Sequence, residues 1–217
     1  MTLSPLQALI LARSSVRRYE ERDVSDADVL STVEAARLAP SASNGQPWRF
    51  IIVKSLEARE ALTRACFSGI FSPTRFAARA PVIIALCAER GRALAAAQSL
   101  KDKAMYQLDC GIAGEHLVLR AAELGLGTCW IGWFNRRRAR RALGAPAHVR
   151  VVSLIALGYP AAGQAARKKI RRPLESFVFR DSWNTPWPGA AGTPEALQDG
   201  GWAAQPGGSA GRGNSSK

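Results

Sequence analysis

The sequence predicts an α+β fold of two or three layers, in which helices pack against one central sheet. Four short apolar segments are typical of strands, and amphipathic or capped helical segments lie between them. Four strands are few for a doubly wound parallel sheet, which favours an α+β domain. The chain has 217 residues, of which 47% are hydrophobic, so it is long enough for one domain with a full core.

The helices are predicted from their capping residues and apolar periodicity. Ser4 is a good N-cap with Pro5 in the first turn, and Ser25 begins a second helix that Pro40 ends. The helix at 104–125 is apolar on nearly every side, which is typical of a central or interface helix. The predicted helices span residues 4–12, 25–38, 55–65 and 104–125, followed by an arginine-rich helix that Asn135 caps.

The strands are predicted at 48–53, 80–88, 128–134 and 149–160. The first of them, "WRFIIV", has few charges, so we expect it to be buried in the sheet. Beyond residue 185 the chain becomes rich in Gly, Ala, Pro and Ser and loses apolar periodicity. We therefore expect one domain at 1–185 and a flexible C-terminal tail at 186–217.

The net charge of +13 raises the question of a nucleic-acid partner. Two basic runs, at 136–141 and 167–172, carry much of it. A solvated helix face and a clamp for a small anion explain these runs as well, and no nucleic-acid-binding motif accompanies them. We therefore expect no nucleic-acid partner.

Cysteine and histidine usage argues against a metal site. The four cysteines form no CxxC pair and the chain has only two histidines. The apolar stretch at 6–12 is too short for a signal sequence, and no run approaches the roughly 20 residues of a membrane span. We expect a cytoplasmic protein with buried, reduced thiols, no metal and no membrane association.

No side-chain catalytic constellation emerges from the sequence. It has no nucleophile elbow, no phosphate-binding loop and no dinucleotide fingerprint, and the glycines near 125–132 follow a helix instead of a strand. His116 lies inside the apolar helix, where a packed core histidine is expected more often than a general base. If the protein is an enzyme, a bound cofactor carries the reaction and no catalytic residue can be assigned.

Three segments carry side chains that suit a cofactor. "RSSVRRY" (13–19) surrounds hydroxyl groups with arginines that can bind phosphate. "SASNGQPW" (41–48) offers a hydroxyl and two amides, which can donate and accept at once. "KKIRRPLE" (168–175) adds further cations. Each segment alone is equally typical of caps, surface pairs or a turn.

Together, and in this order, these segments resemble the FMN-dependent nitroreductase family. The matching stretches include "APSASNGQPWRFIIV", "GIAGEHLVLRAAELGLGTCWIGWF" and "LIALGYP", and the resemblance spans residues 13 to about 183. It implies a three-layer α+β fold with a mostly antiparallel sheet. It also implies a homodimer that is formed by long helices, exchanges terminal segments and holds two FMN sites at its interface.

The resemblance also implies the residues of each FMN site. Arg13, Ser14, Ser15 and Arg17 would hold the phosphate, the ribityl chain and the pyrimidine edge, where Arg17 would favour hydride acceptance. Ser41, Asn44 and Gln46 would come from the partner subunit, and Lys169 and Arg171 would bind the phosphate. The backbone amides near Ile131, Gly132 and Trp133 would face the flavin ring. Some relatives carry an acidic residue in place of Gly132, so a role for that acid is absent here.

The activity implied is an NAD(P)H oxidoreductase that reduces flat acceptors, such as nitroaromatics or quinones, in two hydride-transfer steps. The alternatives in the same fold are a dehydrogenase, a reductive dehalogenase and a flavin-cleaving enzyme. Their lid residues cannot be located in 66–79 or 89–103. A basic nucleic-acid-binding protein is the remaining alternative from another class.

Overall fold

The computed structural model describes residues 3–89, 105–163 and 169–190. The chain divides into two compact units between residues 167 and 168. The helices of the first unit are α1 (Pro5–Ala12), α2 (Asp26–Arg37), α3 (Leu56–Cys66), α5 (Met105–Glu123) and α6 (Arg136–Ala142). Its strands are β1 (Trp48–Val53), β2 (Val82–Ala88), β3 (Gly127–Ile131) and β4 (Arg150–Gly158). Its described residues also form two 3₁₀ helices, η1 (Ala42–Asn44) and η2 (Gly69–Arg79).

Side-chain caps set the helix starts that the sequence predicts. The Ser4 hydroxyl accepts from the N–H of Gln7, whose own side chain accepts from the Ser4 N–H, which completes a capping box. The hydroxyls of Ser25 and Ser55 cap α2 and α3 by accepting from the N–H groups of Asp28 and Ala58. The Asn135 side chain accepts from the N–H of Arg138 at the start of α6. The predicted helices are confirmed, and their ends move by one or two residues.

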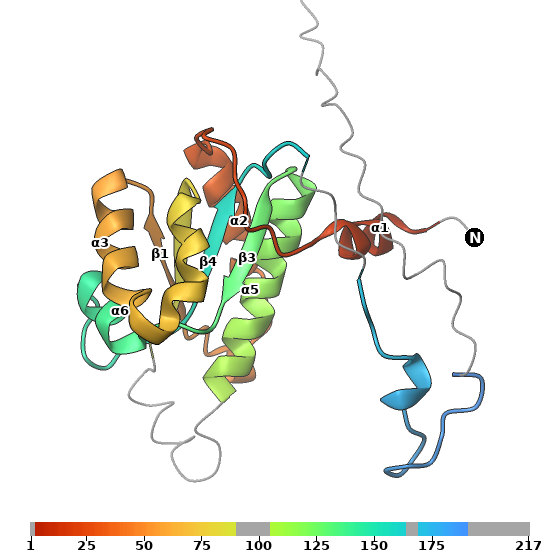
Figure 1. The fold of residues 1–217 in the computed structure, drawn as a ribbon. Coiled ribbons are helices and arrows are strands. Elements are labelled where there is room, and N and C mark those ends of the chain that lie inside the picture. The colour runs from red at the N-terminus through yellow and green to blue at the C-terminus, as the bar shows by residue number, and fades with distance from the viewer. Residues whose placement is uncertain (1–2, 90–104, 164–168, 191–217) are drawn as a thin grey trace, which may run out of the picture. The chain divides into compact units, whose positions relative to one another are not determined.

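The four strands form one antiparallel sheet in the order β1-β2-β4-β3. All seven residues of β2 are buried, because helices cover both faces of the sheet. Ile84 and Leu86 pack with α2 and α5 on one face, whereas Ile83 and Ala85 pack with α3 and α6 on the other. Figure 1 shows the sheet between these helices. Alternate residues of β2 thus face opposite helix layers, which gives the predicted three-layer α+β arrangement.

Two strand predictions are wrong in detail. β1 is an edge strand with partly exposed residues, whereas its scarcity of charges had indicated a buried strand. The apolar run at 128–134 leaves the sheet after Ile131. Apolar composition does not distinguish these cases, because Trp133 lies exposed in the turn and Phe134 packs under α6.

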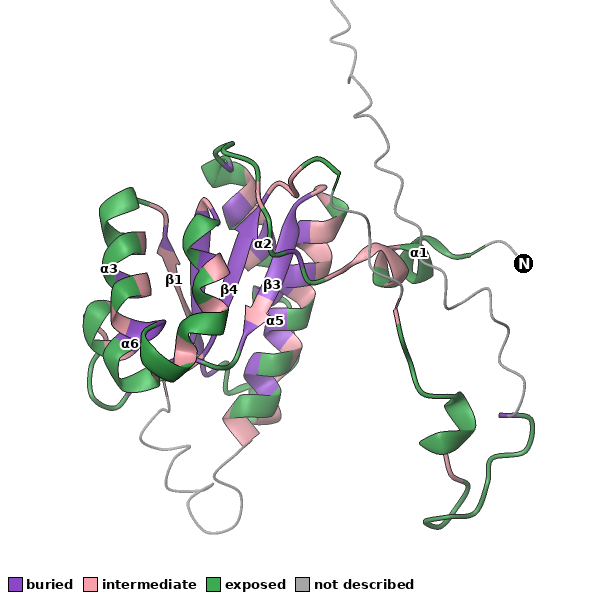
Figure 2. Ribbon diagram, viewed as in Figure 1, coloured by how far each residue is buried: buried purple, intermediate pink, exposed green. Residues whose placement is uncertain are grey.

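Two features of the first unit had no counterpart in the sequence prediction. Residues 69–79 form η2, which is not among the helices predicted from the sequence. The apolar helix α1 contains no buried residue (Figure 2), and Leu6 and Ile10 are 60% and 50% exposed. Among the residues described, no helix combines the length and hydrophobicity needed to cross a bilayer.

The second unit contains one short 3₁₀ helix, η3 (Leu174–Ser176), and a turn closed by a bridge between Phe179 and Pro186. Phe179 stacks on Trp183 with ring centroids 5.0 Å apart. Trp183 and Trp187 remain exposed. The predicted tail at 186–217 falls outside the described residues beyond 190, so the domain boundary at 185 stays a prediction.

Candidate functional site

The arginine-rich segment 13–19 is fixed along the edge strand β3. The N–H of Val16 donates to the carbonyl of Thr128 at 2.8 Å, and Ser15 forms a parallel bridge with Thr128. The Val16 side chain is buried directly over Gly127, where an added Cβ would come within 2.6 Å of it. Glycine at 127 therefore allows the close approach of the segment to the strand.

This arrangement brings Arg13, Ser14, Ser15 and Arg17 to one edge of the sheet. The Arg17 guanidinium lies 5.7 Å from the ring centroid of Phe76 in η2. Burial raises the pKa of the Cys129 thiol, and Arg17, Ser15 and Arg13 each act to lower it. The influence of both arginines on one strand residue shows that positive charge gathers beside β3.

The turn after β3 directs its carbonyl groups into the protein. The carbonyl of Ile131 accepts from Ser153 Oγ at 2.9 Å, that of Gly132 from Arg136 at 3.5 Å, and that of Trp133 from Thr74 at 3.2 Å. Within the part of the chain that is described, the N–H groups of Gly132 and Trp133 form no hydrogen bond. Two donors are thus left for a ligand at the end of β3.

Gly132 itself is exposed, and a Cβ at this position would meet no atom within 4 Å. A larger residue would fit here, so glycine is not required by packing. Beside it, Trp133 is 52% exposed and packs edge-on against Phe71 of η2, with ring centroids 6.0 Å apart. The 3₁₀ helix η2, in which no lid residue could be located from the sequence, thus lies next to these donors.

The loop at 41–46 has an unusual backbone. Ser43, Asn44 and Gln46 have positive φ angles of 50°, 54° and 43°. Such angles cost free energy in residues other than glycine, and they gather at binding sites. The N–H of Gln46 donates to Ser41 Oγ at 3.0 Å, and its side-chain amide donates to Asn44 Oδ1 at 2.9 Å. The loop therefore presents exposed polar groups in a fixed arrangement.

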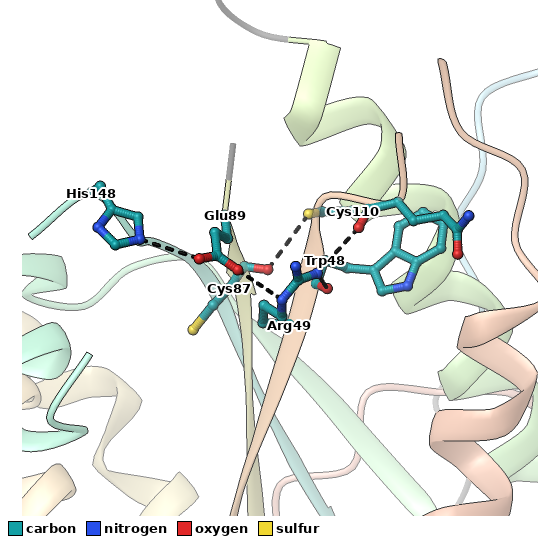
Figure 3. Close-up of polar contacts among 7 residues, drawn as sticks. Trp48, Arg49, Cys87, Glu89, Cys110 and His148 are labelled. Atoms are coloured by element: carbon teal, nitrogen blue, oxygen red, sulfur yellow. Dashed lines mark hydrogen bonds and ion pairs between the residues drawn. The ribbon is translucent and has the colours of Figure 1, made fainter. Parts of the chain in front are cut away.

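Residues that the sequence prediction missed hold this loop in place. Asp109 of α5 is buried, and its carboxylate accepts from the N–H of Ala42 at 3.0 Å. Arg49 donates to the carbonyl of Gln46 at 3.3 Å and pairs with Glu89 at 2.9 Å. Figure 3 shows Glu89 between Arg49 and His148. The hydrogen bond from His148 and the charge of Arg49 lower the pKa of Glu89, so the pair stays charged at neutral pH.

The described thiols do not act as nucleophiles at neutral pH. Burial raises the pKa of Cys66 and Cys110 to about 12 and that of Cys87 to about 11. Thiols with such pKa values are almost fully protonated. No group of His, Cys, Asp and Glu in the described ranges could hold a metal ion. His116 is half-buried on α5, less enclosed than a core histidine would be.

The structure places two of the predicted groups of site residues on one strand. Arg13 to Arg17 lie at the start of β3, where Ser15 bridges Thr128, and Ile131 to Trp133 lie at its other end in the same protomer. Ser41, Asn44 and Gln46 lie on the loop fixed to α5 and β1, so their approach to a partner's flavin stays a prediction. Lys169 and Arg171 lie in the second unit, and their role in phosphate binding also stays a prediction.

A family model and curated relatives match most of this chain. The family model described as the nitroreductase family matches residues 10–159. An Archaeoglobus fulgidus protein, provisionally named NADH dehydrogenase/NAD(P)H nitroreductase, is 36% identical over 179 residues, covering 81% of this chain and 97% of its own. A Bacillus subtilis protein named FMN reductase [NAD(P)H] is 29% identical, covering 78% of this chain and 70% of its own.

Solved structures agree. A nitroreductase family protein from Clostridium novyi NT superposes with a TM-score of 0.65 at 27% identity, covering 85% of this chain and 97% of its own. The family match includes both the arginine segment and the end of β3, which form the candidate site. The chain therefore belongs to the nitroreductase family.

Proposed function

We propose that this protein is an FMN-dependent NAD(P)H oxidoreductase that reduces nitroaromatic or quinone-type acceptors. The observation that carries the proposal is that one strand, β3, has the arginine segment 13–17 at Thr128 and the free N–H groups of Gly132 and Trp133 just beyond its other end. The names of the relatives, an FMN reductase and an NAD(P)H nitroreductase, support it.

The donors on β3 fit FMN. A phosphate suits the planar guanidinium groups of Arg13 and Arg17, and the polar edge of the flavin ring suits backbone N–H donors. Bound FMN supplies the two-electron chemistry that protonated thiols cannot. The protein's part is to hold the flat ring and to stack the nicotinamide, and then the acceptor, against its open face. We propose that Lys169 and Arg171 add further charge at the phosphate.

A homodimer accounts for the apolar side chains that one protomer leaves exposed to water. α1 buries none of its residues, although Leu6 and Ile10 are large and apolar, and Leu108 on α5 is 59% exposed. α1 and α5 contact one another, so these side chains belong to neighbouring helices. A partner subunit that covers both helices would remove this apolar surface from water.

The activity is tested with the purified protein under exclusion of oxygen. We expect a yellow protein with the absorbance of a bound flavin at about 450 nm. This absorbance should bleach with NADH or NADPH and return when a quinone or nitroaromatic is added. A panel that also contains iodinated and saturated substrates separates this reaction from dehalogenation and dehydrogenation. A colourless protein that takes up no added FMN would contradict the proposal.

The loop at 41–46 gives a further prediction. Asn44→Gly removes the side-chain amide and keeps the positive φ of 54° without strain, whereas Asn44→Ala would add strain of its own. We expect Asn44→Gly to weaken FMN binding by about tenfold, the effect of losing one or two hydrogen bonds. Fluorescence titration of flavin-free protein measures the change. Unaltered affinity, with an unaltered melting temperature, would mean that Asn44 only shapes the turn.

A further inference from the structure

A cavity lies beyond the end of β3, and none of the residues assigned to FMN lines it. Its volume is about 480 Å³, which is within the range of small-molecule sites. Helix α6 and the start of β4 form its walls, and Tyr106 and Gln107 at the start of α5 close it. The space exists because β3 pairs with β4 only up to Leu154, so the first residues of β4 have no neighbouring strand on that side.

Four arginines line this cavity: Arg136, Arg137, Arg140 and Arg150. Among the lining residues that the structure describes, there is no carboxylate. Over the described ranges of the chain, none of the four forms an ion pair. The nearby acids are engaged elsewhere, because Glu89 pairs with Arg49 and His148, and Asp109 accepts from the loop at 41–46. The cavity is thus a concentration of uncompensated positive charge.

Such a cavity suits a ligand with several phosphate groups. Guanidinium groups bind phosphate oxygens in pairs of charge-assisted hydrogen bonds. Tyr106 and Gln107 add an aromatic ring and an amide, which are groups that can stack on a base and bond to its edge. The lining therefore fits a nucleotide better than it fits an inorganic anion.

One residue links the cavity with the candidate flavin site. Arg136 lines the cavity, and it also donates to the carbonyl of Gly132, whose free N–H is assigned to the flavin. A ligand with its reactive ring at Gly132 and its phosphates near Arg136 would span both places. NADPH has this form, with a nicotinamide at one end and a 2′-phosphate on the adenosine at the other.

We propose that the arginine cavity binds the adenosine half of NADPH, with the 2′-phosphate among Arg137, Arg140 and Arg150, and so selects NADPH over NADH. The assignment of the nicotinamide end rests on the proposed function. The assignment of the arginines rests on the cavity itself. The two can therefore fail separately.

Two variants remove single charges from different walls of the cavity. The side chains of Arg137 and Arg150 form no hydrogen bond with the described residues, so Arg137→Gln and Arg150→Gln are not expected to disturb the fold. Arg141→Gln is the matched control, because Arg141 is exposed on the same helix as Arg137 but does not line the cavity. We expect each cavity variant to raise the KM for NADPH about tenfold and to change the KM for NADH less than twofold.

Binding is measured as well as turnover. Calorimetric titration of the flavin-loaded protein with 2′,5′-ADP, and separately with 5′-AMP and inorganic phosphate, should show the tightest binding for 2′,5′-ADP. That preference should be lost in Arg137→Gln and kept in Arg141→Gln. Equal effects of the variants on NADPH and NADH, or binding of 2′,5′-ADP that all three variants leave unchanged, would overturn the proposal.

A hydride donor without phosphates distinguishes a failure of the cavity assignment from a failure of the proposed function. 1-Benzyl-1,4-dihydronicotinamide has the reactive ring of NADPH and none of its phosphates. If it bleaches the flavin equally in the wild type and in all three variants, while NADPH kinetics change only in the cavity variants, the inference stands. If it bleaches the flavin and NADPH kinetics do not change in any variant, the cavity assignment alone is wrong. If it fails to bleach the flavin of the wild type, the proposed function is wrong.

Discussion

Arg17→Gln is expected to weaken FMN binding by at least about tenfold, which corresponds to about 1.4 kcal/mol or more of binding free energy. The residue lies on the segment that hydrogen-bonds along β3, and its guanidinium faces Phe76 near Cys129. A cation at this edge of the sheet would pair with a phosphate or with the polar rim of the flavin, and such charge-assisted bonds are the strong ones. Glutamine keeps much of the length and removes the charge.

The loss would be measured by fluorescence titration of the flavin-free variant with FMN, beside Arg18→Gln as the matched control. Arg18 is the next residue, carries the same charge and is exposed as well. We expect Arg18→Gln to bind FMN with less than a threefold change. The flavin that Arg17→Gln retains should have a lower midpoint potential, because a positive charge near the ring stabilises its reduced form. Equal losses of FMN affinity in both variants would show that binding depends on the net charge of the protein and not on the position of Arg17.

The helices were predictable because their starting signals are local. Ser4, Ser25, Ser55 and Asn135 each cap a helix with their own side chain, and the cap bonds a residue three positions along the chain. The strand segments were recognisable as apolar runs, since burial by helices on both faces requires apolar residues throughout. Their order in the sheet was not predictable, because pairing is a contact between distant parts of the chain. For this reason β1 could be found in the sequence but not placed at the edge.

The candidate site was predictable only in part, because its residues also come from distant parts of the chain. The resemblance marked Arg13 and Gly132 as site residues, but only the structure places their segments on the same strand, at the two ends of β3. Asp109 escaped notice because a lone acid in an apolar helix carries no signal, and its partner lies 67 positions away in sequence. The arginine cavity was visible only as a charge run. Its shape depends on where β3 ends, and apolar composition had extended that strand by three residues.

Gly114→Ala is expected to lower the free energy of unfolding by roughly 2 kcal/mol, after the better helix propensity of alanine is set against the clash. Gly114 is buried where α5 crosses Trp130 of β3. An added Cβ would overlap the Trp130 ring at Cη2, and it would lie 2.7 Å from Cζ2 and 3.2 Å from Leu86 Cδ2. The ring cannot yield freely, because the helix lies on one side and the sheet on the other. For a chain of this size the melting temperature should fall by about 4–8 °C.

Gly111→Ala on the same helix is the control. Gly111 is exposed, and its added Cβ would meet no atom within 4 Å, so alanine should stabilise the helix by about 0.5–1 kcal/mol. If the loss in Gly114→Ala comes from the indole, Trp130→Phe should restore part of it, because phenylalanine lacks the outer ring that the Cβ would strike. Trp130 also leads directly into the donors at Gly132 and Trp133, so Gly114→Ala should weaken FMN binding together with stability. A stability loss that Trp130→Phe does not relieve would place the strain in the helix backbone and would separate the packing of α5 from the flavin site.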